Sequence, residues 1–374
     1  KAGSQPGTVD VDLDVKDKLP LHASISYDDR HTAQTTPNRL TANLAYDNLW
    51  QRLDSLSLLY QTAPANRKNA SVESGTYIAH APGASGFAAI SYTHTNSNVL
   101  ALGTLGVLGK GDIYGLHWVQ PLPGTDVLSE NLNAGADYKS VNTDVRPDVP
   151  PTTDGGTSSP RSAPVTAPVH YMNWSNVYTA TWRFPTRTIT TSLGANFGLD
   201  DIVNKAQEFN TARYDASADY LYLRFSSGVI QRLPANFAVL TRVTGQWADT
   251  PLVNNEQFSL GGVDTVRGYL EAETLGDTGA AGTVELHSPD FGPHLHPVLT
   301  QLYLFTFVDA GIATLLDPLP GQDYHLDLWS TGAGLQLAGP GGLVGSVDYA
   351  IPEKNGIDTH RHHGRVDFSL QFGF

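Results

Sequence analysis

The segment GGVDTVRGYLEAE, residues 261–273, places a single arginine, Arg267, among glycines, acidic residues and a tyrosine. A guanidinium can donate to two carboxylate oxygens at once and stays charged in any environment. In an ordinary loop it is solvated, whereas in a protein interior it needs acidic partners, because an unpaired buried charge is costly. Its neighbours Gly261, Gly262 and Gly268 permit a tight, closely packed backbone. The segment is therefore a candidate ion-pair site whose partners must come from other parts of the chain.

Other patterns with chemical potential are weaker. The imidazoles of HRHH, residues 360–363, are close enough to share a metal ion, but a solvated loop explains them more simply. The sequence has no nucleophile–base motif, P-loop or dinucleotide fingerprint, so we expect no enzymatic activity, no cofactor and no metal. The net charge of −14 argues against a nucleic-acid partner, and the absence of cysteine fits an oxidising compartment.

The elements that must position Arg267 have the periodicity of β-strands. The last ten residues, RVDFSLQFGF, alternate strictly, and NRLTANLAYD and DYLYLRFS repeat the pattern. The apolar face of the last segment consists of Val366, Phe368, Leu370, Phe372 and Phe374. The chain has no run of 18 apolar residues that would suggest a membrane helix, and no helix-period segment of convincing length.

Alternation alone suits either a soluble sandwich or a membrane barrel, and three features favour the barrel. The strands are long, roughly 9–12 residues, as a tilted crossing of the bilayer requires. Aromatic residues recur near strand ends, as in interfacial girdles: Tyr27, Tyr46, Trp50, Trp118, Trp247 and Tyr349. Short and long links also alternate along the chain, which a sandwich would not require.

We expect sixteen strands, near 20–29, 38–48, 53–62, 71–81, 86–96, 111–121, 127–142, 168–183, 187–198, 218–230, 236–248, 282–289, 299–311, 326–338, 342–351 and 365–374. The predicted fold class is all-β: a closed 16-stranded antiparallel transmembrane β-barrel over residues 19–374. Arg267 then lies in the sixth long link, 249–281.

With the strands in this order, GGVDTVRGY resembles the signature of the outer-membrane assembly and secretion superfamily, which includes BamA, TamA and the TpsB transporters of two-partner secretion. The family's F-x-D-x-G motif on the thirteenth strand resembles FVDAG, residues 307–311, and its acidic residue on the twelfth strand matches Glu285. The terminal FSLQFGF resembles the family's insertion signal, with Phe368, Leu370, Phe372 and Phe374 as its apolar residues.

The resemblance implies that the sixth loop folds back into the lumen. The loop-lock residues would be Arg267, Gly268 and Tyr269 on the loop, and Glu285, Phe307, Asp309 and Gly311 on the wall. Alternation places Asp309 on the same lumen face as Phe307 if Val308 meets lipid, so a pair between Arg267 and Asp309, with Glu285 nearby, is physically coherent. We expect a wet lumen and therefore a pair that is only partly desolvated.

Within the superfamily, the TpsB branch (FhaC/ShlB/CdiB-like) is the most similar. The stretch PGTVDVDLDVKDKLPLHASISYDD resembles the end of a POTRA domain running into the first strand, so residues 1–18 would be the end of a truncated periplasmic POTRA domain and its linker. The resemblance implies a pore in the outer membrane of a Gram-negative bacterium that passes a large TpsA-like exoprotein from periplasm to cell surface. Further partners would be outer-membrane lipids, lipopolysaccharide, assembly machinery and periplasmic chaperones.

Two alternatives remain open at this point. A BamA/TamA-type insertase would work by opening the seam between the first and last strands, and it predicts weak pairing there. A passive diffusion porin would have a constricting loop with opposed charge clusters and no VRGY motif. A hydrolase at the barrel rim is a weaker reading, because no spacing pattern supports it.

Overall fold

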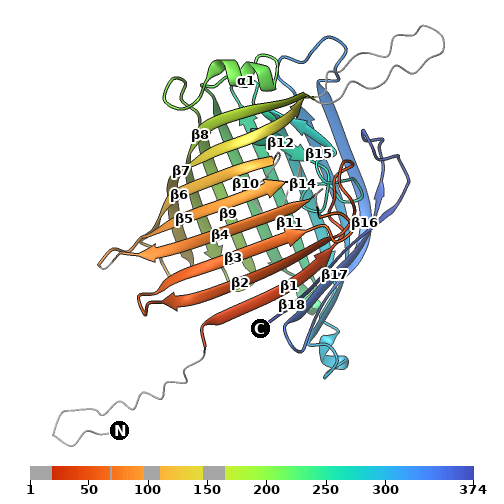
Figure 1. Cartoon of the computed structure of the whole chain (residues 1–374). Coiled ribbons are helices and arrows are strands. Elements are labelled where there is room, and N and C mark those ends of the chain that lie inside the picture. Colours follow the sequence, from red (N-terminus) through yellow and green to blue (C-terminus); the bar gives the residue numbers. More distant parts are fainter. Residues whose placement is uncertain (1–18, 68–69, 82, 97–109, 146–164) are drawn as a thin grey trace, which may run out of the picture.

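The computed structural model describes residues 19–67, 70–81, 83–96, 110–145 and 165–374. Sixteen antiparallel strands close into one barrel, which confirms the predicted fold class (Figure 1). The barrel strands are β1 Leu21–Asp28, β2 Arg39–Leu49, β3 Asp54–Thr62, β4 Ser71–His80, β5 Phe87–Asn96, β6 Lys110–Leu122, β7 Leu128–Val145, β8 Val165–Arg183, β9 Arg187–Phe197, β10 Leu221–Arg232, β11 Ala238–Ala248, β14 Thr278–His287, β15 Gln301–Thr314, β16 His325–Gly339, β17 Leu343–Pro352 and β18 Arg365–Gly373. The expected POTRA remnant, residues 1–18, lies outside the described residues.

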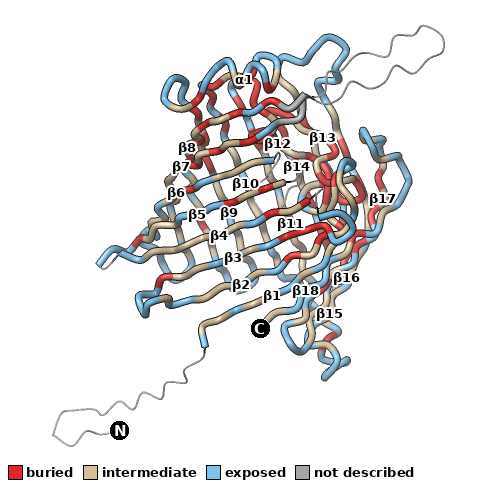
Figure 2. The backbone as a smooth tube through the Cα atoms, viewed as in Figure 1, coloured by how far each residue is buried: buried red, intermediate tan, exposed pale blue. Residues whose placement is uncertain are grey.

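Each strand presents apolar side chains outward and a different set of residues inward. On β15, Leu304 and Val308 are about half exposed on the outer face, whereas Phe305, Phe307 and Asp309 are buried inside. Figure 2 shows buried positions alternating with exposed ones along the strands and gathering at the end near α1. This period of two is what a sheet between lipid and a filled lumen requires.

The barrel closes by antiparallel pairing of β1 with β18. The register runs from Ser24 opposite Gly373 to Asp28 opposite Ser369, which is five pairs, compared with seven between β17 and β18. The backbone of Phe374 extends the ladder by two hydrogen bonds to Ala23, at 3.0 and 3.1 Å. The expected closure between the first and last strands is therefore present, and it is short.

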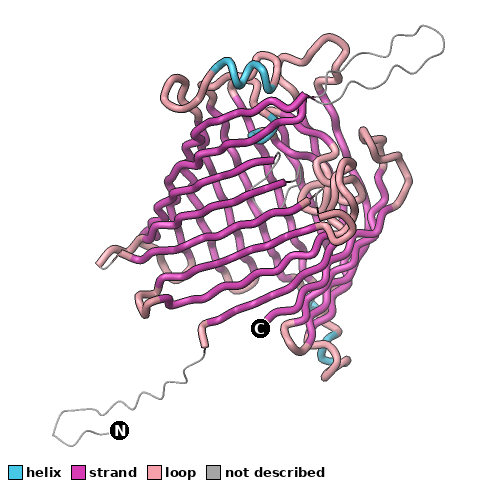
Figure 3. Tube along the Cα trace, viewed as in Figure 1, coloured by secondary structure: helices cyan, strands magenta, loops and turns pink. Residues whose placement is uncertain are grey.

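The links alternate between the two ends of the barrel, and most links at one end are the shorter ones; the exception is the link from β14 to β15, residues 288–300, which is as long as several loops at the other end. The sequence indicated no helix, yet the loop between β9 and β10 contains a short one, α1 Ala206–Ala212, at the long-loop end (Figure 3). The helix is too short to show a clear 3.6-residue period, and Phe209, which is fully buried, holds it against Tyr171 and Tyr220. The part of the chain that the structure describes also contains three 3-10 turns: η1 Pro234–Asn236, η2 Asn254–Glu256 and η3 Gly292–His294. Among the described residues, no helix is long and apolar enough to span a bilayer.

Residues 249–277, here called loop 6, join β11 to β14 and contain a small hairpin, β12 Phe258–Leu260 and β13 Thr274–Gly276. The hairpin packs on the inner face of β14 and β15, where small residues leave room for it. A Cβ added at Gly311 would lie 2.4 Å from Leu260 Cδ1, which explains why this wall position is glycine.

The start of β14 differs from the prediction. The sequence pattern predicted that the strand begins at residue 282, whereas it begins at Thr278. Three of its four opening residues, Gly279, Ala280 and Ala281, are small and poor strand formers. These residues pair with β15 because the loop 6 hairpin packs on them. This is a tertiary contact, which the local sequence pattern does not reveal.

Candidate functional site

Arg267 reaches from loop 6 to the barrel wall and binds two carboxylates there. Its Nε and Nη2 donate to Asp309 Oδ2 and Oδ1 at 2.7 and 2.8 Å, so that pair is bidentate. Its backbone N–H also donates to Asp309 Oδ2, at 3.1 Å. Nη1 lies 2.8 Å from Glu285 Oε1 on β14. One guanidinium thus joins loop 6 to two adjacent strands.

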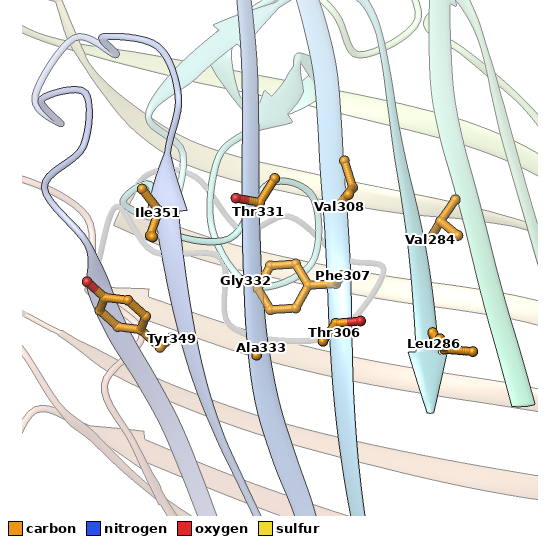
Figure 4. A pocket seen from close by; sticks show the side chains of 10 residues that line it. All are labelled: Val284, Leu286, Thr306, Phe307, Val308, Thr331, Gly332, Ala333, Tyr349 and Ile351. Atoms are coloured by element: carbon orange, nitrogen blue, oxygen red, sulfur yellow. The ribbon is translucent and has the colours of Figure 1, made fainter. Parts of the chain in front are cut away.

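Aromatic rings close the site from the side. The guanidinium carbon of Arg267 lies 3.5 Å from the ring centroid of Phe307, a cation–π contact. A Cβ at Gly332 on β16 would lie 2.3 Å from Phe307 Cζ, so the glycine makes room for the ring. Figure 4 shows Phe307 beside Gly332 at a groove between Val284 and Tyr349.

The site is almost fully buried, which corrects the expectation of a partly desolvated pair. The side chains of Arg267, Glu285 and Asp309 are 5%, 5% and 1% exposed. Burial alone would lower the pKa of Arg267, but the hydrogen bond and charge of Asp309, together with Glu285, raise it above its ordinary value. Loop 6 itself excludes the water that an open lumen would contain, so each charge depends on its protein partners.

The two residues after Arg267 fix the direction of the loop. Gly268 has a φ of +86°, and a Cβ there would lie 3.1 Å from the Cβ of Ala350 on β17. Tyr269 is buried, and its hydroxyl is 3.1 Å from the carbonyl of Trp329 and 2.9 Å from that of Lys354. Every loop-lock residue named from the sequence therefore lies at the junction between loop 6 and β14–β17.

Two inward-facing carboxylates near this junction were not selected from the sequence as site residues. Asp348 on β17 and Asp367 on β18 are buried, and Asp348 Oδ1 and Asp367 Oδ2 have no hydrogen-bond partner among the described residues. The alternation of the last strand placed Asp367 on the polar face, which was the available signal. Arg267 therefore faces a wall with more negative than positive charge.

Loop 6 is also held by the neighbouring long loops. Glu273 accepts hydrogen bonds from the backbone N–H groups of Asp358 and Thr359, both at 2.7 Å. Asp264 pairs with Arg30 at 2.9 Å. The histidines of residues 360–363 lie in the loop that Glu273 caps, and no cluster suited to a metal ion occurs among the described residues.

Glu271 gives the docking of loop 6 a predicted pH dependence. Burial raises the pKa of its carboxyl from 4.5 to about 7, and Arg30 only partly opposes this. In a released, solvated loop the pKa returns to its ordinary value, so the docked state binds protons more tightly. This contribution is fully present below pH 4.5 and is lost as the pH rises through 7.

We therefore expect residues 261–273 to exchange amide hydrogens faster at about pH 8 than at about pH 5, beyond the intrinsic change in rate. In Glu271→Gln this extra dependence should shrink, because an amide does not titrate. An unchanged pH dependence in the variant would assign the effect to another group.

Comparison with known proteins identifies the family. The model for haemolysin secretion/activation proteins ShlB/FhaC/HecB matches residues 7–107 and 167–337. The chain belongs to this family. As a ShlB/FhaC/HecB-family barrel it lies in the outer membrane of a Gram-negative bacterium, as expected from the sequence.

Several relatives of this ShlB/FhaC/HecB-family chain are similar along most of its length. The heme/hemopexin transporter protein HuxB of Haemophilus influenzae strain 86-028NP is 25% identical over 97% of the chain, which corresponds to 62% of HuxB. CdiB from Escherichia coli has the same fold, with a TM-score of 0.73, 17% identity and coverage of 96% of this chain and 64% of CdiB. BamA from Haemophilus ducreyi, lacking POTRA domains 1–3, gives a TM-score of 0.63 at 14% identity, covering 96% and 71% of the two chains. The chain therefore spans less than two thirds of HuxB and CdiB.

Proposed function

We propose that this barrel is the outer-membrane pore of a two-partner secretion system, and that loop 6 must leave the lumen for a cognate exoprotein to pass. Family membership supports the secretion role. The observation that carries the role of loop 6 is the buried attachment of Arg267 to Asp309 and Glu285, which joins the loop to two strands inside the barrel.

The proposed mechanism depends on the source of free energy for export of the exoprotein. The periplasm supplies no ATP, so an unfolded exoprotein that enters from the periplasmic end would be drawn outward by folding at the cell surface. The wall would provide a closed, paired scaffold, and loop 6 would occupy or vacate the path. Outer-membrane lipids and lipopolysaccharide would surround the barrel, and periplasmic chaperones and the assembly machinery would deliver it.

An insertase remains the second candidate, because the β1–β18 ladder is short. Beyond Asp28 the strands are joined through a side chain: Asp29 Oδ1 accepts from the backbone N–H of Phe368 at 2.9 Å. An insertase would need this seam to open, whereas secretion through the lumen would not. A disulfide across the seam should therefore abolish an insertase and leave secretion intact.

Removing the lumen part of loop 6 should open the pore. Gln246 Nε2 donates to the carbonyls of both Glu256 and Asp277, at 2.9 and 3.0 Å, so the two ends of the segment between them are close in space. A Gly-Gly linker can therefore replace residues 258–276 with little strain on β11 and β14. We expect severalfold larger single-channel conductance in planar bilayers than for the unmodified chain. Equal conductance would mean that loop 6 does not obstruct the lumen.

A further inference from the structure

A second charged cluster holds loop 6, far along the loop from Arg267. Glu256, at the end of η2, is 1% exposed. Its Oε1 lies 2.5 Å from Lys139 Nζ on β7 and accepts from Tyr171 Oη on β8 at 2.5 Å. Its Oε2 accepts from Tyr222 Oη on β10 at 2.6 Å. One loop carboxylate thus binds three strands of a wall that Arg267 does not touch.

The charge of Glu256 is balanced within this cluster. Burial would raise the pKa of the carboxyl, but Lys139 and Arg224 outweigh it and hold the pKa below its ordinary value. The site therefore contains an ion pair with two additional hydroxyl donors, and nearly all of the carboxylate's hydrogen-bonding capacity is used. The Arg267 site differs, because more carboxylates than cations face it.

The other end of loop 6 is fixed next to the same place. Asp277 is fully buried and binds Arg213, with Nη2 to Oδ2 at 2.7 Å. It also accepts from the backbone N–H groups of Leu252 and Leu316, at 2.9 and 2.7 Å. Gln246 joins both ends through the carbonyls of Glu256 and Asp277. Residues 249–257 and Asp277 therefore form a base that is attached to the barrel independently of the rest of the loop.

An apolar cluster surrounds this base. Leu252 and Val253 pack in a buried group with Phe209 of α1, Tyr171 and Tyr222. Beyond the base, the chain turns at Gly261 and Gly262, whose φ angles of +104° and +99° are accessible to few other residues. The loop thus divides into a base that belongs to the barrel core and an arm, residues 258–276, that lies against β14–β17.

We propose that Glu256 is the positioning residue on which loop 6 is anchored: the arm leaves the lumen when the Arg267 contacts break, while the base stays bound to β7, β8 and β10. This inference rests on the proposed function, because it specifies which part of the loop moves. It also predicts that the path opens beside β14–β18 rather than beside β7–β10.

Residues 1–374 contain no cysteine, so single-cysteine reporters in this chain are a direct test. The experiment uses the complete gene product in outer-membrane vesicles, with any cysteine outside these residues replaced by serine. Val266→Cys reports on the arm, and Asn255→Cys reports on the base; the native side chains are 0% and 7% exposed. The probe is a membrane-impermeant maleimide. Adding Arg267→Ala should speed labelling of the arm cysteine by about tenfold or more and leave the base cysteine protected.

Glu256 itself is tested in the same background. Adding Glu256→Ala to Arg267→Ala should now expose the base cysteine, by about tenfold. Glu256→Gln should keep most of the protection, because its amide oxygen can accept from one tyrosine and its NH2 group can donate to the hydroxyl oxygen of the other. Asp264→Ala, which removes a partly exposed carboxylate of the arm, is the matched control and should leave the base cysteine protected. Retained heat-modifiable migration on gels confirms a folded barrel in each variant.

The outcomes separate the anchor from the proposed function. If Arg267→Ala exposes the arm and the base together, the loop moves as one unit and the anchor is refuted, while a mobile loop 6 survives. If neither cysteine becomes accessible, Arg267 does not hold the loop, and the proposed role of loop 6 fails together with the anchor. If Glu256→Ala leaves the base protected, Glu256 is not the anchor.

Discussion

Arg267→Ala should release loop 6 and leave the barrel assembled. The substitution removes the cation from Asp309 and Glu285, whose side chains are only 1% and 5% exposed. Breaking a buried pair by removing one partner costs about 3–5 kcal/mol. The cost would be smaller for the same pair in a water-filled lumen. The barrel is held by continuous strand ladders, so this cost should appear as undocking of the loop. We expect larger and more variable single-channel currents, with normal amounts of barrel in the outer membrane.

Related variants distinguish the ion pair from simple loss of packing. Arg267→Lys keeps the charge but loses the bidentate geometry with Asp309, so it should be intermediate. Asp309→Ala should resemble Arg267→Ala, and the double variant should be no worse than either alone, because the three changes remove the same interaction. Additive effects, or channel currents unchanged by Arg267→Ala, would contradict the assigned role.

Loss of Phe374 should impair assembly of the barrel. The residue is 82% exposed, and its backbone makes two hydrogen bonds to Ala23 at the end of the short β1–β18 ladder. Deleting it removes both bonds, roughly 1–3 kcal/mol in total, from the closure of the barrel. It also removes the last aromatic residue of the alternating strand that resembles the insertion signal. We expect less heat-modifiable protein in the outer-membrane fraction.

A substitution on the other face of β18 provides the control. Gln371 alternates with the apolar residues Leu370 and Phe372, so Gln371→Asp places a charge away from the apolar outer face. It should assemble nearly normally, whereas Phe372→Asp should assemble poorly. Equal assembly of all these variants would show that the terminal strand contributes no specific signal.

The barrel could be predicted because its determinants are local and repeated. Period two identifies strands such as β15 and β18, and the alternation of short and long links identifies the two ends of the barrel. The partners of Arg267 came from three motifs in their expected order, and the observed contacts with Asp309 and Glu285 agree with that pairing.

The other features of the site depend on which wall residues loop 6 covers. The local sequence pattern holds no information about that contact. Alternation shows that Lys139 faces inward but not that a loop carboxylate, Glu256, lies against it. The burial of Arg267 and the early start of β14 have the same cause, since the loop both excludes water and packs on small wall residues. Loop 6 therefore occupies the lumen through contacts with strands that are distant in the sequence. Taken separately, the sequences of the loop and of these strands give no sign of those contacts.

The most direct test of a mobile loop 6 is a reversible crosslink between Gly268 and Ala350. A Cβ at Gly268 lies 3.1 Å from that of Ala350, close to the separation of about 3.5–4.5 Å that a disulfide spans. The chain has no other cysteine to interfere. The measurement is secretion of the cognate exoprotein by cells that carry Gly268→Cys/Ala350→Cys, in oxidising medium and after addition of reductant. We predict that secretion stops when the crosslink forms and resumes when it is reduced, so that the reduced protein is the control for the two substitutions themselves. Undiminished secretion by the fully crosslinked protein would contradict the account.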